Sequence, residues 1–91
     1  MAINQELIEK LEAAHTFPSP YTFRIIGLNL PNYESSILEA LNHLQVKKVS
    51  ERYSENRKHL SLTLQINAER PQVVLETYEM LAKLPNVKYV L

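Results

Sequence analysis

The sequence predicts an α+β fold of the ferredoxin-like kind, with elements that alternate as β-α-β-β-α-β after an extra N-terminal helix. Residues 59–67 alternate strictly between apolar and polar side chains, as a strand with one buried face does. Residues 33–44 and 69–84 instead repeat their apolar residues at helical spacing. A chain of 91 residues has room for one hydrophobic core, so these elements belong to one domain.

The first segment, residues 4–15, is predicted to be an amphipathic helix. Ile3, Leu7 and Leu11 recur at helical spacing. Asn4 is a suitable N-cap because its side chain can accept a hydrogen bond from a backbone amide of the first turn. The apolar stripe of this helix must cover either its own domain or a second copy of the chain.

Two prolines, Pro18 and Pro20, follow this helix. Because each proline lacks an amide donor and favours an extended path, the helix must end before them. We therefore divide the chain into an N-terminal amphipathic helix over residues 1–16 and a single ferredoxin-like domain over residues 17–91.

The remaining strands are predicted over residues 21–27, 45–54 and 87–91. Two crossovers of the βαβ type then flank a hairpin. The simplest arrangement is a four-stranded antiparallel sheet in the order 4-1-3-2, with two helices on one face. The opposite face is expected to carry Thr22, Arg24, Ile26, Ser61, Thr63, Gln65 and Lys88. Simple alternation in the last strand places Val87, Tyr89 and Leu91 on the other side from Lys88 and Val90.

The composition argues against most catalytic chemistry. The chain has one glycine, no cysteine and no aspartate, which excludes phosphate-binding glycine loops, nucleophile elbows, thiolate sites and catalytic aspartates. The three histidines, His15, His43 and His59, do not have the spacing of metal ligands. We therefore expect no catalytic residues, no metal and no cofactor, and the protein is not expected to be an enzyme.

The sequence also indicates where in the cell the protein is located. The chain lacks cysteine, its first residues lack the basic and apolar regions of a signal peptide, and no apolar run approaches the ~20 residues that span a membrane. A cytoplasmic protein without membrane association is expected.

The charge is neutral overall but unevenly distributed. Residues 47–58 contain five basic and two acidic residues, a net charge of +3. This stretch forms a candidate partner-binding patch, with the alternative that it is an ordinary solvated hairpin. Its basic residues are Lys47, Lys48, Arg52, Arg57 and Lys58. Nucleic acid is not an expected partner, because the polar positions of residues 59–67 carry no aromatic side chain on which bases could stack.

Arg24 is a candidate ligand-binding residue, since it lies mid-strand on the polar face beside Thr63 or Gln65. A guanidinium group matches carboxylate and phosphate geometry, so Arg24 could anchor an anion. An ordinary surface arginine or ion pair is the alternative.

The segment Phe17-Pro18-Ser19-Pro20-Tyr21-Thr22-Phe23-Arg24-Ile25-Ile26-Gly27 resembles the opening of the YbeD-like family of small bacterial proteins of unknown function. The block from Leu60 to Ala68 and the ending Val87-Lys88-Tyr89-Val90-Leu91 resemble that family as well.

The resemblance implies a fold similar to the ACT regulatory domains, which bind amino acids and other small ligands and often pair through their sheets. ACT domains commonly place a glycine beside the ligand in the loop after the first strand. By that resemblance Gly27, Asn29 and Asn32 are further candidate ligand-binding residues, although this loop lacks the usual acidic residue.

Together these features predict a small regulatory or binding module that recognises a small anionic metabolite or a partner protein and can form a homodimer. An adaptor that uses the basic hairpin and the N-terminal helix, or a weak nucleic-acid binder, is the alternative.

Overall fold

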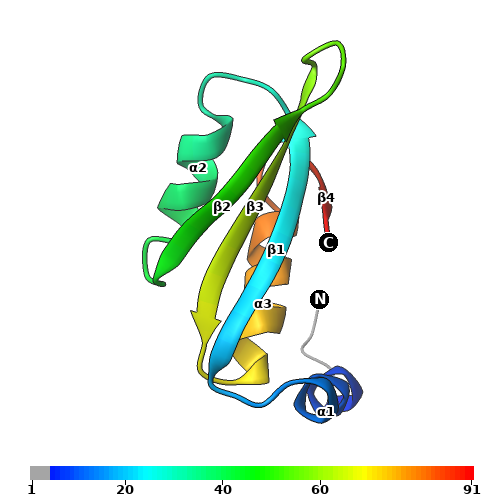
Figure 1. Ribbon diagram of the computed structural model, residues 1–91, viewed down its shortest axis with the longest axis vertical. Helices are drawn as coiled ribbons and strands as arrows, with labels where there is room; N and C mark the ends of the chain where they lie inside the picture. The colour runs from blue at the N-terminus through cyan, green and yellow to red at the C-terminus, as the bar shows by residue number, and fades with distance from the viewer. Residues whose placement is uncertain (1–4) are drawn as a thin grey trace.

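The computed structural model describes residues 5–91, which fold as an α+β domain (Figure 1). Along the chain the elements are α1 (Gln5–Ala14), β1 (Ser19–Leu28), α2 (Tyr33–Ala40), β2 (Val46–Tyr53), β3 (His59–Ala68), α3 (Pro71–Ala82) and β4 (Val87–Val90). The predicted N-cap Asn4 and the apolar Ile3 lie outside the described residues.

The four strands form one antiparallel sheet in the order β2-β3-β1-β4. Read from the β4 edge, this is the order 4-1-3-2 that the sequence suggests. In Figure 1 the strands lie in front of α2 and α3, which cover the same face of the sheet. Within residues 5–91, no helix covers the other face.

The hydrophobic core lies between the sheet and these two helices. Leu60, Leu62, Leu64 and Ile66 of β3 are all buried, as the alternating pattern predicts. Phe23 and Ile25 of β1 are buried beside them, and the helices close the core from the other side with Ile37, Val74 and Leu81. Because the long central strands turn every second residue toward this core, their remaining residues must face outward.

Both core helices are shorter than their apolar spacing predicts. The segment 33–44 is helical only as far as Ala40, and the segment 69–84 only over Pro71–Ala82. After α2 the amide of Leu44 donates to the carbonyl of Leu41, three residues earlier, as in a tighter turn. Leu41 is still buried and Leu44 still packs on the core, so the apolar spacing continues past the end of the helix.

The alternation expected for the last strand is wrong, because β4 contains a bulge. Ile26 pairs with Tyr89, but the next residue, Gly27, pairs with Val87, so Lys88 is an extra residue in the ladder. Val87 and Val90 consequently pack against the core, whereas Tyr89 turns to the face without helices.

The N-terminal helix packs on its own domain, which answers the question the sequence leaves open. Helix α1 lies beyond the end of the sheet near the start of β1 (Figure 1) and contacts α3. Its buried residue is Ile8, and Leu11 packs against the core.

Candidate functional site

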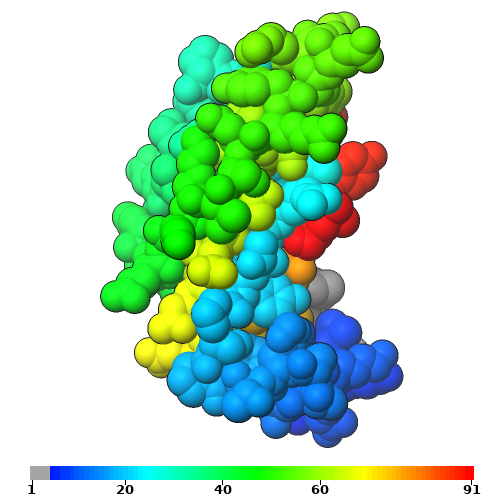
Figure 2. Space-filling model, viewed as in Figure 1, coloured from blue at the N-terminus to red at the C-terminus, as the bar shows by residue number. Residues whose placement is uncertain are grey.

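The candidate site is the face of the sheet that no helix covers, which we call the open face (Figure 2). It is defined by the strand register: each of its residues pairs with another of the set, on the side opposite the buried core. Its members are Thr22, Arg24, Ile26, Lys47, Ser50, Arg52, Ser61, Thr63, Gln65, Tyr89 and Leu91. Leu91, just after β4, joins the sheet through two backbone hydrogen bonds with Arg24, of 3.0 and 2.8 Å.

Three of these residues are cations arranged around two hydroxyl groups. Arg24 pairs with Thr63, and Thr63 pairs with Ser50 on its other side. Lys47 and Arg52 lie on β2, in the pair positions on either side of that row. With strands ~4.8 Å apart and a rise of ~3.3 Å per residue, each is about 12 Å from Arg24 between Cα atoms. Side chains as long as these can therefore reach one ligand from three directions.

The positive charge of this face is not compensated by acidic side chains. Among residues 5–91, Arg24, Lys47 and Arg52 take part in no ion pair and no side-chain hydrogen bond. The single acidic residue in the four strands is Glu51, which pairs with buried Leu62 and so faces the helices. The open face can therefore donate charge-assisted hydrogen bonds to an external anion.

The predicted basic patch is divided by the fold. Lys47 and Arg52 belong to the open face, but Lys48 faces α2, where its Nζ lies 3.1 Å from Glu34 Oε1 and 3.4 Å from Glu51 Oε1. The hydrogen bond to Glu34 raises the pKa of Lys48 above its ordinary value. Arg57 and Lys58 lie in the β2–β3 turn, where the Arg57 guanidinium is 4.8 Å from the centre of the Tyr53 ring. The five basic residues therefore occupy three separate surroundings.

Gly27 lies in the core rather than beside an open ligand site. A Cβ atom there would be 2.3 Å from the carbonyl oxygen of Asn86 and 2.5 Å from Cε1 of Tyr33. The Tyr33 ring fills this space, and its hydroxyl donates to the carbonyl of Ile25 over 3.1 Å. Burial raises the pKa of Tyr33 to about 12. The protein's own tyrosine thus occupies the space beside the glycine.

Asn29 and Asn32 lie in the loop that joins β1 to α2. Asn29 holds the β2–β3 turn, because its Nδ2 donates to the carbonyl of Arg57 and its backbone amide to that of Lys58, both over 2.9 Å. Asn32 precedes α2, and its carbonyl accepts hydrogen bonds from Ser35 and Ser36, while its side chain makes no capping bond. Of the four candidate ligand residues, the fold places Arg24 alone on the open face.

Five members of the open face were not predicted to lie there: Lys47, Ser50, Arg52, Tyr89 and Leu91. Lys47 and Arg52 were predicted only as part of the basic patch. A second bulge, between Lys48 and Ser50, brings Ser50 opposite Thr63. The β4 bulge turns Tyr89 and Leu91 to the open face. Tyr89 is 65% exposed and Leu91 is 60% exposed. Neither bulge leaves a mark in the sequence, because no glycine or proline lies at either position.

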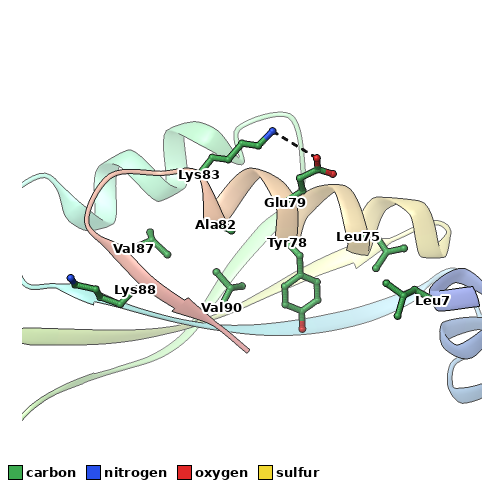
Figure 3. A pocket seen from close by; sticks show the side chains of 9 residues that line it. All are labelled: Leu7, Leu75, Tyr78, Glu79, Ala82, Lys83, Val87, Lys88 and Val90. Carbon is green, nitrogen blue, oxygen red and sulfur yellow. Dashed lines mark ion pairs between the residues drawn. The ribbon is translucent and has the colours of Figure 1, made fainter. Parts of the chain in front are cut away.

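A separate groove lies between α1, α3 and β4 (Figure 3). Its volume is about 540 Å³, and its walls include Leu7, Leu75, Tyr78, Val87 and Val90. An ion pair of 3.7 Å between Lys83 and Glu79 lies at its rim. The walls are mostly apolar and contribute none of the open-face residues.

Residues 5–91 contain neither a cluster of metal-ligating side chains nor a helix that could span a membrane. No three or more His, Cys, Asp or Glu side chains come together in a way that could hold a metal ion. None of the helices in this part of the chain has the length and apolar character needed to cross a membrane.

The chain has a ferredoxin-like fold similar to that of ACT domains, and solved structures share it. The solution structure of protein HP0495 from H. pylori is similar with a TM-score of 0.70 and 17% identity, covering 85% of each chain. The crystal structure of the ACT domain from GTP pyrophosphokinase of Chlorobium tepidum has a TM-score of 0.63 and 14% identity, covering 79% of this chain and 94% of that one. These likenesses concern the fold.

Residues 12–91 match the family described as protein of unknown function, DUF493, and the chain belongs to that family. This confirms the YbeD-like resemblance seen in the sequence. No curated protein sequence matches the chain.

Proposed function

We propose that this protein is a small, non-catalytic binding or regulatory module that recognises a small anionic metabolite on its open face. The observation that carries the proposal is the group Arg24, Lys47 and Arg52, three outward cations without an acidic partner among residues 5–91. On an ordinary soluble surface, basic and acidic side chains are interspersed. Solubility alone therefore does not explain why three basic side chains gather on the open face without an acidic one.

Arg24 is the central contact of the proposed site. It lies on an inner strand, where it pairs with Thr63 of β3 on one side and its backbone amide and carbonyl both hydrogen-bond with Leu91 on the other. A guanidinium can donate two parallel hydrogen bonds to one carboxylate or phosphate. The hydroxyl groups of Thr63 on β3 and Ser50 on β2 lie in the same cross-strand row as Arg24 and can donate to the remaining oxygens.

The proposal is tested by titrating the protein with sodium phosphate and with sodium citrate at low ionic strength, using calorimetry or amide chemical shifts. We expect binding that weakens as salt is added, because exposed charges are screened. In Arg24→Gln the affinity should fall about ten- to a hundredfold, the effect of losing one charged hydrogen-bonding group of ~1.5–3 kcal/mol.

The matched control is Lys58→Gln, which removes the same charge from the β2–β3 turn and should leave the affinity unchanged. If neither anion binds at millimolar concentration, the proposal is wrong. It is also wrong if Arg24→Gln and Lys58→Gln weaken binding equally, because the effect would then reflect net charge and not the open face.

A further inference from the structure

Tyr89 adds an aromatic surface to the cationic side of the sheet. Its side chain is 65% exposed, although it lies within a strand and pairs with Ile26. Leu91, which is 60% exposed, pairs with Arg24 in the next row. An apolar patch of Ile26, Tyr89 and Leu91 therefore adjoins Arg24 on the same face.

The spacing of these groups suits a ligand with a flat ring and a phosphate. Residues diagonally opposite on neighbouring antiparallel strands are ~7–8 Å apart between Cα atoms, and this is the relation of Tyr89 to Arg24. Arg52 occupies the same cross-strand row as Ile26, with Ser61 between them. A ring placed on Tyr89 and Ile26 therefore has two arginines near it. Arg24 lies two residues from Ile26 along β1, and Arg52 lies on β2 in the same row as Ile26.

We propose that the open face binds a nucleotide, whose base lies on Tyr89 and Ile26 and whose phosphate is held by Arg24 and Arg52. This inference rests on the proposed function and names its ligand class. A phosphate presents more acceptor oxygens than a carboxylate, so two guanidinium groups and the hydroxyls of Ser61 and Thr63 can share it. The nucleotide is either a free mononucleotide or part of a single strand, since both present the same base and phosphate.

The test compares ribose 5-phosphate with each of the four common ribonucleoside 5′-monophosphates by calorimetry. Stacking of a base on an aromatic side chain changes affinity by roughly 5- to 150-fold. We therefore expect at least one nucleotide to bind at least about fivefold more tightly than ribose 5-phosphate. Tyr89→Ala should abolish that difference and leave the affinity for ribose 5-phosphate unchanged, whereas Arg24→Gln should weaken the binding of both.

The matched control is Tyr53→Ala, which removes an exposed tyrosine from the helix-facing side of β2 and should leave the preference for a nucleotide intact. Because the Tyr89 side chain is largely exposed, its replacement should leave the thermal unfolding curve nearly unchanged, which shows that the variant is folded.

The outcomes separate this inference from the function on which it rests. If ribose 5-phosphate binds through Arg24 but no nucleotide binds more tightly, the anion site stands and the nucleotide inference is wrong. If Tyr89→Ala leaves the preference in place, the inference is also wrong. If none of these compounds binds, and phosphate and citrate fail as well, both proposals are wrong. A single-stranded oligonucleotide, titrated in parallel, distinguishes a strand from a free nucleotide as the source.

Discussion

Gly27 illustrates how a single residue can be interpreted in two ways. Its place after the first strand, in a chain that resembles ACT domains, suggested a ligand site. In the structure it is buried, and the Tyr33 ring and the Asn86 carbonyl lie within 3 Å of the position a side chain would take. The requirement for glycine here therefore comes from packing between β1, α2 and the loop before β4.

Gly27→Ala should destabilise the protein. The added methyl group must displace a backbone carbonyl and a buried ring, and overpacking of this kind costs about 1–3 kcal/mol. For a domain of this size we expect the thermal midpoint to fall by roughly 5–20 °C. Asn32→Ala is the control, because the Asn32 side chain is exposed and makes no capping bond. A midpoint unchanged in Gly27→Ala would contradict the packing role.

Among the site residues, the sequence located those whose neighbours follow from simple alternation. Arg24 was expected beside Thr63 or Gln65, and it pairs with Thr63, since both strands are regular where they pair. The environment of Lys48 was not, because its partner Glu34 comes from a helix 14 residues away in the chain. An ion pair between a strand and a helix depends on how the two elements pack, and the spacing of residues in the sequence does not predict that packing.

At the scale of whole elements, the two central strands were predicted well and the two edge strands less so. β1 and β3 are flanked on both sides and half-buried, so their side chains must alternate. The edge strands β2 and β4 each contain a bulge, which edge position tolerates. Each bulge shifts the alternation by one residue, and the two shifts brought Ser50 and Tyr89 to the open face.

Helix α1 is attached to the domain mainly through one buried residue. Ile8 is 6% exposed, and replacing a buried isoleucine by alanine costs about 2–5 kcal/mol. In Ile8→Ala we expect the amides of α1 to exchange with solvent much faster, while those of β1 and β3 keep their protection. Hydrogen exchange measured by NMR checks this, with Glu9→Ala as an exposed control in the same helix. Equal loss of protection in α1 and in the central strands would show that the helix and sheet unfold together.

For the whole molecule, the buried tyrosines predict how stability depends on pH. Burial raises the pKa of Tyr33 from 10.0 to about 12 and also raises that of Tyr78. The unfolded chain therefore releases these protons at lower pH than the folded chain does. Their contribution to stability is fully present below pH 10 and is lost as the pH rises toward about 12.

Denaturant midpoints measured from pH 8 to pH 12 should therefore decline through the upper half of that range. The double variant Tyr33→Phe, Tyr78→Phe should show a shallower decline. An identical decline in the double variant would show that the buried phenols are not the cause.

The bulge in β4 also gives this strand a place where its length can change. Lys88 is the residue that the ladder does not need: without it, Val87 would still pair with Gly27 and Tyr89 with Ile26, in ordinary alternation. Loss of Val90 would instead move Leu91 to the wrong side of the sheet. Among members of the family, insertions and deletions in this strand should therefore concentrate at position 88 and spare the residues after it.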